Sequence, residues 1–368
     1  MCVISEEAIA QFEALMEQVD EALKTTFQNI HQGCTRDAYL RFLTAREGNV
    51  ANAHKMLVDS LTWRVENEID DILAKPIIPT ELYRAIRDSQ LIGMPGYTKE
   101  GLPIFAFGAG LSTYDKASVH YYVQSHIQIN EYRDRVVLVK RIHKSLSFVY
   151  VCAHFNPLHF TKLIHMSQPA ASKKYGKHIS KSLKVLDMTG LKLSALNQIK
   201  LLTIISSIDD LNYPEKVVAY YIVNAPYIFS ACWKVVKPLL QERTRKKVQV
   251  LSGCGQDDLL KIMDYSSLPH FCRREGSGSS RYSGSSNENC YSLDHPFHQQ
   301  LYDYIKQQAL LRRPVQPVKQ GSVHVDFPDA VTEGTEFVQT LASEFQKFGK
   351  QNGLAQSLDD LNINDHRA

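Results

Sequence analysis

The most regular pattern of hydrophobic and polar positions lies in the second half of the chain. An apolar helical run, 199–208, precedes a continuous apolar, β-branched and aromatic run, 217–223, of the length of a strand buried on both faces. A second helical pattern covers 227–240, and a second strand pattern covers 248–251. Strand, helix and strand of these lengths predict a βαβ unit and therefore a parallel sheet.

The predicted helix 227–240 is apolar around nearly its whole circumference, and its only charged residues are Lys234 and Lys237. Such a helix is either buried on every side or lies against apolar material that is not protein. The pattern leaves two interpretations open, an ordinary core helix and a lid over a lipid cavity.

Other helices and strands are predicted along the rest of the chain. Acidic residues near its start favour a helix over 5–28. Ser112 and Asp115 have the spacing of a capping box, which predicts a helix from there to about Arg135. Helical patterns also cover 37–46, 50–61, 79–90 and 194–209, strand patterns cover 103–107 and 179–187, and a basic loop is expected at 241–247.

The composition changes after Arg273. Residues 276–286 are Gly and Ser except for Arg281 and Tyr282, which predicts a flexible linker. Two amphipathic helices are expected beyond it, one with Phe297, Leu301, Tyr304 and Ile305 on one face and one with Phe337, Leu341, Phe345 and Phe348. The pattern does not decide whether they dock on the core, bind a partner or touch a membrane.

Length and composition indicate a globular protein of more than one domain. The 368 residues are 44% hydrophobic, which supports a sizeable core, and no apolar run reaches the ~20 residues of a membrane-spanning helix. Seven scattered cysteines indicate free thiols in a reducing compartment, and the N-terminal residues lack the pattern of a signal peptide. We therefore expect a cytosolic protein.

The net charge of +3 is unevenly distributed. Between Arg133 and Lys184 there are eleven Lys or Arg and one Asp, whereas from Gly321 onward eight acidic residues accompany three basic ones. A basic middle region fits an anionic membrane surface, a nucleic acid or simply a solvated face. A nucleic-acid binder would use Trp233 and the basic run 243–247, but one Trp in an apolar helix is a poor stacking platform.

Motifs that carry catalysis are absent from the sequence. It contains no GxxxxGK[ST] loop, no GxGxxG after a strand, no GxSxG elbow and no HExxH. Asp209 and Asp210 are adjacent on a helix, so their carboxylates point in different directions. The Cys and His residues of 152–165 fit no zinc spacing. We expect no enzyme, no metal site and no cofactor.

Several short motifs together resemble the CRAL-TRIO family, in particular its secretory phosphatidylinositol/phosphatidylcholine transfer proteins of the short plant type. They are Asn212-Tyr-Pro-Glu-Lys, Tyr220-Tyr-Ile-Val-Asn-Ala-Pro, Lys237-Pro-Leu-Leu, and Thr244 with Lys247. The resemblance covers about residues 35–273. It implies an α/β fold in which a largely parallel sheet, flanked by helices, adjoins an apolar cavity with a helical gate, preceded by a small all-helical lobe.

The resemblance also implies site residues. An inositol headgroup site would comprise Arg46, Glu215, Thr244 and Lys247, although Glu47 replaces a family Lys. A second headgroup position would comprise Ser182, Lys184 and Tyr132. Relatives that handle phosphatidylcholine have a Ser-x-Thr pair here, and Lys184 replaces its second hydroxyl. The resemblance therefore supports the binding of inositol lipids more strongly than that of choline lipids. The gate helix would present Tyr227, Phe229, Trp233, Val236 and Leu240.

Residues 139–168 depart from the family, whose members pass directly from a motif like Val136-Val-Leu to one like Pro169-Ala-Ala-Ser-Lys-Lys. The extra segment begins with Val and ends with Gln, which fits the ends of a GT…AG intron, and we interpret it as a retained intron. We accordingly divide the chain into a helical lobe (1–75), a lipid-binding domain (76–273, with the insertion) and a linker with a helical tail (274–368).

The function expected from the resemblance is binding of a phospholipid, phosphatidylinositol or also phosphatidylcholine, for transfer between membranes or presentation to a lipid kinase. Expected partners are phospholipids, a transient membrane surface and a partner of the tail, but no nucleic acid. The protein would be cytoplasmic and peripherally associated with Golgi, endosomal or plasma membranes. The alternative is a lipid-sensing interaction module for another hydrophobic ligand, without bulk transfer.

Overall fold

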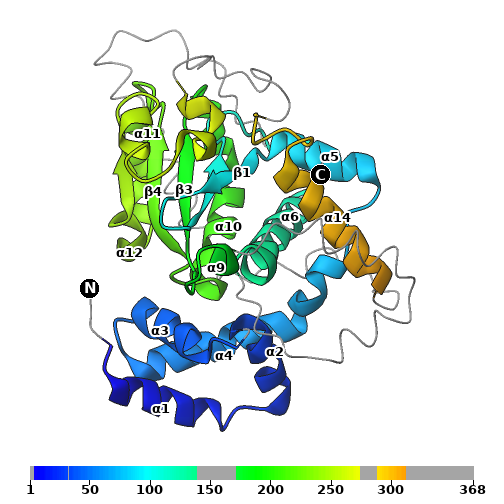
Figure 1. Ribbon diagram of the computed structural model, residues 1–368, viewed down its shortest axis with the longest axis vertical. Coiled ribbons are helices and arrows are strands. Elements are labelled where there is room, and N and C mark those ends of the chain that lie inside the picture. Colours follow the sequence, from blue (N-terminus) through cyan, green and yellow to red (C-terminus); the bar gives the residue numbers. More distant parts are fainter. Residues whose placement is uncertain (1–3, 32, 139–170, 274–287, 312–368) are drawn as a thin grey trace, which may run out of the picture. The chain divides into compact units, whose positions relative to one another are not determined.

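The computed structural model of the chain describes residues 4–31, 33–138, 171–273 and 288–311 (Figure 1). It divides the chain into two compact units, Met1–Pro226 with Lys246–Val325, and Tyr227–Arg245 with Asp326–Ala368. The expected insertion at 139–168, the linker at 276–286 and the second tail helix at 337–348 lie outside the described residues.

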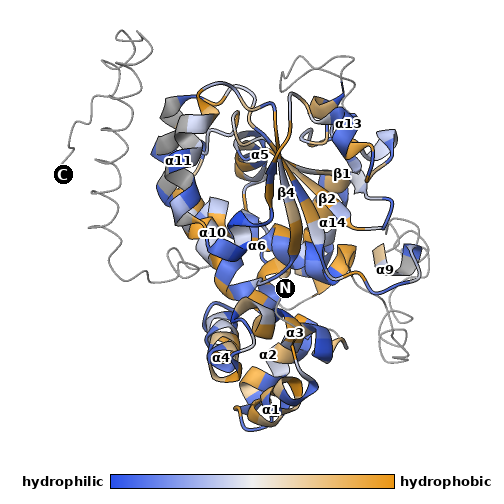
Figure 2. Cartoon of the chain, turned by 90° about the vertical axis from the view of Figure 1, so that its left-hand side faces the viewer, coloured by the Kyte–Doolittle hydropathy of each residue, from blue (hydrophilic) through white to orange (hydrophobic). Residues whose placement is uncertain are grey.

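Four helices open the first unit, α1 (Glu6–Met16), α2 (Glu21–His31), α3 (Thr35–Ala45) and α4 (Val50–Glu66). Ser5 and Asn49 cap α1 and α4, because their side-chain oxygens accept hydrogen bonds from the backbone N–H groups of Ala8 and Asn52. These helices are amphipathic (Figure 2), and Phe12, Phe42, Leu57 and Leu61 are among the side chains of their shared core.

The single helix predicted over 5–28 is wrong, since the chain turns between α1 and α2. Phe12 and Phe27 both place their rings on Tyr39, at centroid distances of 5.0 and 5.5 Å. In one straight helix these two residues would lie about 22 Å apart. Tertiary packing on Tyr39 therefore requires the break, which the local pattern does not reveal.

Five strands form one mixed sheet in the order β1 (Ile92–Tyr97), β2 (Pro103–Phe107), β3 (Ser182–Asp187), β4 (Val217–Val223) and β5 (Val248–Val250). β1 pairs with β2 antiparallel, and the other neighbours are parallel. The predicted strands at 103–107 and 217–223 are confirmed, as is the parallel pairing of β4 with β5. β3 begins three residues later than predicted.

The two faces of the sheet differ in what covers them. On one face Leu183 and Val185 pack with Leu259, Met263 and Phe271 from the segment that follows β5. Residues paired across parallel strands share a face of the sheet, and so do residues two positions apart along one strand. The opposite face is therefore formed by the alternate residues of β2, β3, β4 and β5. We call this set the α10 face, because Lys184 on it contacts Asp209 of helix α10 (Ile199–Asn212). It comprises Phe105, Phe107, Ser182, Lys184, Leu186, Tyr220, Ile222, Val248 and Val250.

The predicted capping box at Ser112 is wrong. Helix α6 (Val119–Tyr132) begins after Ser118 and continues as a π-helix, Arg133–Val137. The Ser112 hydroxyl instead donates to the Gly108 carbonyl (2.8 Å) and accepts from the Leu91 N–H (3.0 Å), so it shapes the loop after β2.

The remaining helical segments are mostly connections. The helix predicted at 194–209 is a 3-10 turn, Leu193–Gln198, followed by α10 (Ile199–Asn212), and the basic loop at 241–247 contains a short helix, α12. The other helical segments of the described residues are a 3-10 helix Ile69–Ala74, α5 (Thr80–Ser89), α9 (Ala171–Lys174), α11 (Phe229–Leu239), α12 (Glu242–Arg245), α13 (Gln256–Leu259), and 3-10 turns Tyr265–Ser267 and His270–Cys272.

The first predicted tail helix is α14 (Pro296–Leu311), and it docks on the first unit. Phe297, Leu301 and Ile305 are buried, at 4%, 0% and 2% exposure. The ring of Phe297 packs edge-on to that of Phe105, and α14 runs beside the 3-10 helix Ile69–Ala74 and β1 (Figure 1). Of the three roles left open for this helix, the structure shows docking on the core.

Candidate functional site

Glu215 and Lys247 meet at the edge where β4 and β5 begin. Lys247 immediately precedes β5, and its Nζ lies 2.6 Å from the Glu215 Oε2. The Glu215 side chain is 8% exposed and that of Lys247 25%. Parallel strands start at the same edge of a sheet, so two residues far apart in sequence become neighbours. This confirms that two of the predicted headgroup residues lie together.

Arg46 lies at the C-terminal end of α3, where its Nη1 donates to the Ala45 carbonyl (3.1 Å). The other end of α3 contacts the segment before β3, because the Ser180 hydroxyl donates to the Asp37 carboxylate (2.9 Å). Glu47, at a position where the resemblance implies a lysine, is exposed and has a φ of 55°.

Thr244 lies in α12, which belongs to the second unit. Its backbone N–H donates to the Gln241 carbonyl (2.9 Å). Of the four residues predicted for the headgroup site, the structure joins Glu215 and Lys247 directly.

The three residues predicted for a second headgroup position have different surroundings. Ser182 donates to the Lys216 carbonyl (3.3 Å), and the Lys184 Nζ lies 3.1 Å from the Asp209 Oδ2. Tyr132 instead packs its ring against Phe297 and Tyr304 of α14. The ring contacts of Tyr132 are thus with α14, whereas the polar contacts of Ser182 and Lys184 are with the residue before β4 and with α10.

Sequence reasoning missed the polar groups around Asp209. Its Oδ1 accepts from the Asn130 Nδ2 (2.7 Å) and lies 2.7 Å from the His126 Nε2, while Lys184 meets Oδ2. Burial would raise the pKa of the Asp209 carboxyl, but His126 and Lys184 together hold that pKa well below its ordinary value. In the sequence, Asp209 was considered only together with the adjacent Asp210, as a possible pair of carboxylates.

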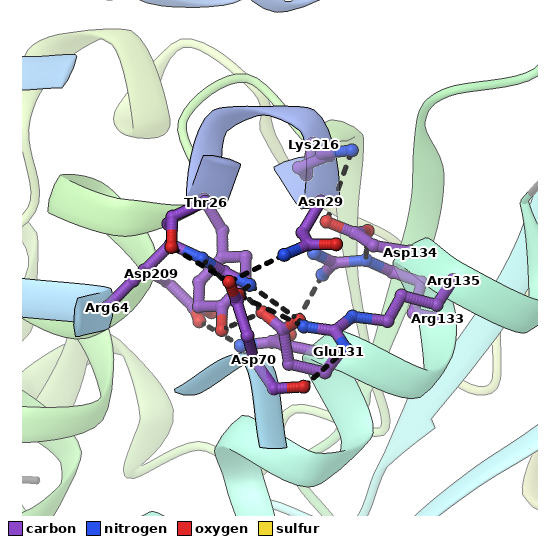
Figure 3. Close-up of polar contacts among 12 residues, drawn as sticks. Thr26, Asn29, Arg64, Asp70, Glu131, Arg133, Asp134, Arg135, Asp209 and Lys216 are labelled. Atoms are coloured by element: carbon purple, nitrogen blue, oxygen red, sulfur yellow. Dashed lines mark hydrogen bonds and ion pairs between the residues drawn. The ribbon is translucent and has the colours of Figure 1, made fainter. Parts of the chain in front are cut away.

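A larger buried network joins the helical lobe to α6 (Figure 3). Arg64 of α4 contacts both Glu131 (Nη1–Oε1 2.7 Å) and Asp70 (Nη2–Oδ1 2.6 Å). Arg135 and the Tyr213 hydroxyl also meet the Glu131 carboxylate, at 2.6 and 2.7 Å. Burial opposes ionisation of Glu131, yet the two arginines lower its pKa strongly. The residues of this network are distant from one another in sequence, so no sequence motif predicts their contacts.

A third buried group lies between this network and the start of β4. The Asp134 carboxylate contacts the Arg133 Nε (2.7 Å) and the Lys216 Nζ (3.2 Å). Burial, together with the nearby Arg41 and Arg133, lowers the pKa of Lys216 to about 8, although Asp134 opposes the shift.

Asn224 marks the end of the first unit before the predicted gate helix. Its backbone N–H donates to the Gly253 carbonyl (2.6 Å) and its Nδ2 to the Asp187 carboxylate (2.9 Å), with a φ of 53°. Pro226 is the last residue of this part of the unit. The chain is therefore held firmly just before the second unit begins.

The predicted gate residues lie in or beside α11. Phe229, Trp233 and Val236 fall within the helix, and the rings of Phe229 and Trp233 stack at 5.9 Å. Leu240 is the C-terminal cap, and Tyr227, just before the helix, is 74% exposed. Helix formation over most of 227–240 is confirmed.

Neither a metal cluster nor a membrane span is found in the part of the chain that the structure describes. No group of three or more His, Cys, Asp or Glu residues there is arranged to hold a metal ion. Likewise, none of the helices described is both long and apolar enough to cross a bilayer. The Cys and His residues of 152–165 lie outside the described residues.

Comparison with known proteins identifies the family. The model of the CRAL/TRIO domain matches residues 87–272, and that of the CRAL/TRIO N-terminal domain matches residues 8–59. The chain belongs to the CRAL/TRIO family. The mixed sheet with its helical N-terminal region is thus the CRAL/TRIO fold, as predicted.

Curated relatives of this CRAL/TRIO protein include transfer proteins. The phosphatidylinositol/phosphatidylcholine transfer protein SFH12 of Arabidopsis thaliana is 28% identical over 69% of this chain and 41% of its own length. The SEC14 cytosolic factor of Eremothecium gossypii is 26% identical over 71% of this chain and 75% of its own length. The CRAL/TRIO chain thus spans about two fifths of SFH12.

Among solved structures, the crystal structure of Sfh5 matches with a TM-score of 0.48 and 17% identity. The match covers 77% of this CRAL/TRIO chain and 86% of that chain. Similarity of this size does not establish a shared fold, which rests on the family match.

Proposed function

We propose that this CRAL/TRIO protein binds a phospholipid, phosphatidylinositol first of all, and carries it between membranes or presents it to a lipid kinase. The observation that carries the proposal is the Glu215–Lys247 ion pair at the edge of the largely apolar α10 face. On that face Val250 is 50% exposed, so apolar surface extends outward from the polar edge. A polar edge beside an apolar face suits an amphiphile.

The headgroup chemistry follows from the side chains at this edge. In our proposal the Lys247 ammonium donates to the lipid phosphate, and Glu215 accepts hydrogen bonds from inositol hydroxyls. Their mutual ion pair holds both side chains in position before a ligand arrives. Arg46 supplies a further phosphate donor in our proposal, while Glu47 offers none, so one contact of the family pattern is missing.

The acyl chains would lie on apolar surface, since each buried CH₂ contributes about 0.8 kcal/mol. We assign the apolar helix α11 the role of a gate that moves when lipid enters or leaves. The boundaries of the second unit, after Pro226 and after Arg245, supply the two ends of such a gate.

The name of the relative SFH12 includes both phosphatidylinositol and phosphatidylcholine, so both headgroups belong to the proposal. We place the protein in the cytoplasm, peripherally associated with Golgi, endosomal or plasma membranes, and propose no catalytic step and no cofactor for it. The alternative, a lipid-sensing interaction module, predicts lipid loading without vesicle-to-vesicle transfer.

Replacing the lysine at this edge tests the proposal. Lys247→Ala should lower phosphatidylinositol transfer between vesicles by at least about tenfold, equivalent to ~1.4 kcal/mol, since a charged phosphate donor is lost. Native mass spectrometry of the purified wild-type protein should show a bound phospholipid.

The matched control is Lys261→Ala. It removes a lysine that forms an exposed ion pair with Asp258. It should leave transfer unchanged. Unaltered phosphatidylinositol transfer in Lys247→Ala would overturn the assigned headgroup site. A wild-type protein that neither carries nor acquires phospholipid would overturn the proposed function.

A further inference from the structure

A pocket of about 420 Å³ is formed within the first unit by β1, α9, the 3-10 turn Tyr265–Ser267 and the beginning of α14. None of the described residues that line it belongs to the proposed headgroup site. Met94, Pro95 and Phe297 give part of the lining an apolar character, and the rest is polar. Pockets of this volume and mixed lining are typical of small-molecule sites.

Lys174 supplies the positive charge of this pocket. Its Nζ lies 5.1 Å from the ring centroid of Tyr97 and 5.3 Å from that of Tyr175, so two aromatic rings hold the ammonium in place. Among the described residues no carboxylate pairs with Lys174, and none of those that line the pocket is acidic. The charge of the pocket therefore favours an anion.

Two neutral donors accompany this charge. The Ser267 Oγ accepts from the Tyr97 N–H (3.3 Å), so its own hydrogen is directed to another acceptor. The His295 Nδ1 accepts from the Phe297 N–H (3.3 Å), and burial lowers the pKa of this imidazole. The neutral ring thus carries its hydrogen on Nε2. A cation with two neutral donors suits a phosphate group, which has several acceptor oxygens.

We propose that this pocket binds a phosphomonoester with a short hydrocarbon body, as a ligand separate from the phospholipid of the α10 face. The Lys174 ammonium, the Ser267 hydroxyl and the His295 Nε2–H donate to the phosphate oxygens, and the hydrocarbon body covers Met94 and Phe297. Such a phosphate comes either from solution, as an alkyl phosphate, or from a membrane, as the headgroup of phosphatidic acid. The inference goes beyond the proposed lipid binding and does not depend on it.

Titration of the full-length protein with hexyl phosphate, followed by calorimetry, tests the pocket. Hexyl phosphate should bind at least about tenfold more tightly than inorganic phosphate, since burial of two CH₂ groups suffices for that ratio. Lys174→Ala, at an exposed position, should weaken the binding of hexyl phosphate at least about tenfold, because the charged donor is lost. The matched control Lys177→Ala alters an exposed lysine outside the pocket and should keep the wild-type affinity.

Sedimentation with phosphatidylcholine vesicles, with and without phosphatidic acid, identifies the source of the phosphate. Recruitment by phosphatidic acid that Lys174→Ala loses assigns a membrane ligand, whereas binding of hexyl phosphate without recruitment assigns a soluble one.

Hexyl phosphate that binds no more tightly than inorganic phosphate, or binding and recruitment that survive Lys174→Ala, would overturn the inference. So would the absence of both binding and recruitment. Binding that falls in Lys247→Ala instead would place the phosphate at the headgroup site. Phosphatidylinositol transfer by Lys174→Ala should equal that of wild type, so the proposed function stands or falls separately.

Discussion

Lys216 shows how a single buried residue is governed by its neighbours. Its Nζ contacts Asp134, while Arg41 and Arg133 oppose its charge and Asp37 favours it. The balance leaves its pKa at about 8, against 10.5 for an ordinary lysine. Because burial and the two arginines disfavour it, the charged form is less stable than in an exposed lysine. Lys216 directly follows Glu215 of the proposed headgroup site in the sequence.

The pKa of Lys216 predicts a pH dependence of stability. Between about pH 8 and 10.5 the unfolded chain keeps the proton that the folded protein has lost, so the free energy of unfolding contributed by this residue rises with pH. Lys216→Met should remove this rise. Its stability relative to wild type should fall by about 3 kcal/mol across the interval, measured by urea unfolding.

The exposed Lys192 serves as the control, since Lys192→Met should follow the wild-type curve. Parallel stability curves for wild type and Lys216→Met between pH 8 and 10.5 would show that Lys216 titrates normally.

At the scale of elements, α14 completes the core of the first unit although it follows a long Gly/Ser-rich segment in sequence. Phe297, Leu301 and Ile305 recur every four residues, so they form one stripe of the helix. That stripe is buried, whereas Leu310 on the same helix is 84% exposed. Docking of this helix stabilises the fold in proportion to the apolar area it covers.

The docking of α14 predicts unequal effects of two truncations. Phe297→Ala should lower the free energy of unfolding by about 3 kcal/mol, because it removes a buried ring that packs against Phe105 and Tyr132. Leu310→Ala should change stability by less than about 0.5 kcal/mol. Chemical denaturation of the two variants checks this, and equal small losses would mean that α14 does not hold to the core in solution.

At the scale of the whole molecule, the residues of the proposed gate belong to the second compact unit, which begins at Tyr227. Asn224 fixes the chain at the end of β4 through its backbone bond to Gly253 and its side-chain bond to Asp187. In our proposal the gate therefore moves without loss of these hydrogen bonds, which hold the end of β4.

The gate predicts a variant that separates lipid exchange from stability. Tyr227 is 74% exposed, so Tyr227→Asp should leave the melting temperature within about 1 °C of wild type. A charge there opposes entry into a bilayer interface, and vesicle-to-vesicle transfer should drop about tenfold. Tyr265→Asp alters an exposed tyrosine of the first unit as the control. Full transfer by Tyr227→Asp would count against a membrane-entering gate.

Much of the fold could be predicted from sequence because it depends on local pattern. The runs at 103–107 and 217–223 are apolar and β-prone, and the structure has strands at those positions. The stripe on α14 follows from helical periodicity, and the motif order was sufficient to indicate the family. Glu215 and Lys247 were expected together from the family resemblance alone, and the parallel pairing of β4 with β5 is what brings them together.

Tertiary structure alone decided the features that depend on distant partners. The turn between α1 and α2 exists because two rings pack on Tyr39, and Ser112 bonds to a loop rather than capping a helix. Whether Lys184 is solvated or buried beside Asp209 is likewise invisible in a linear pattern. Hydrophobic periodicity is a property of neighbours along the chain, whereas burial and pairing of charges arise only when distant segments meet in space.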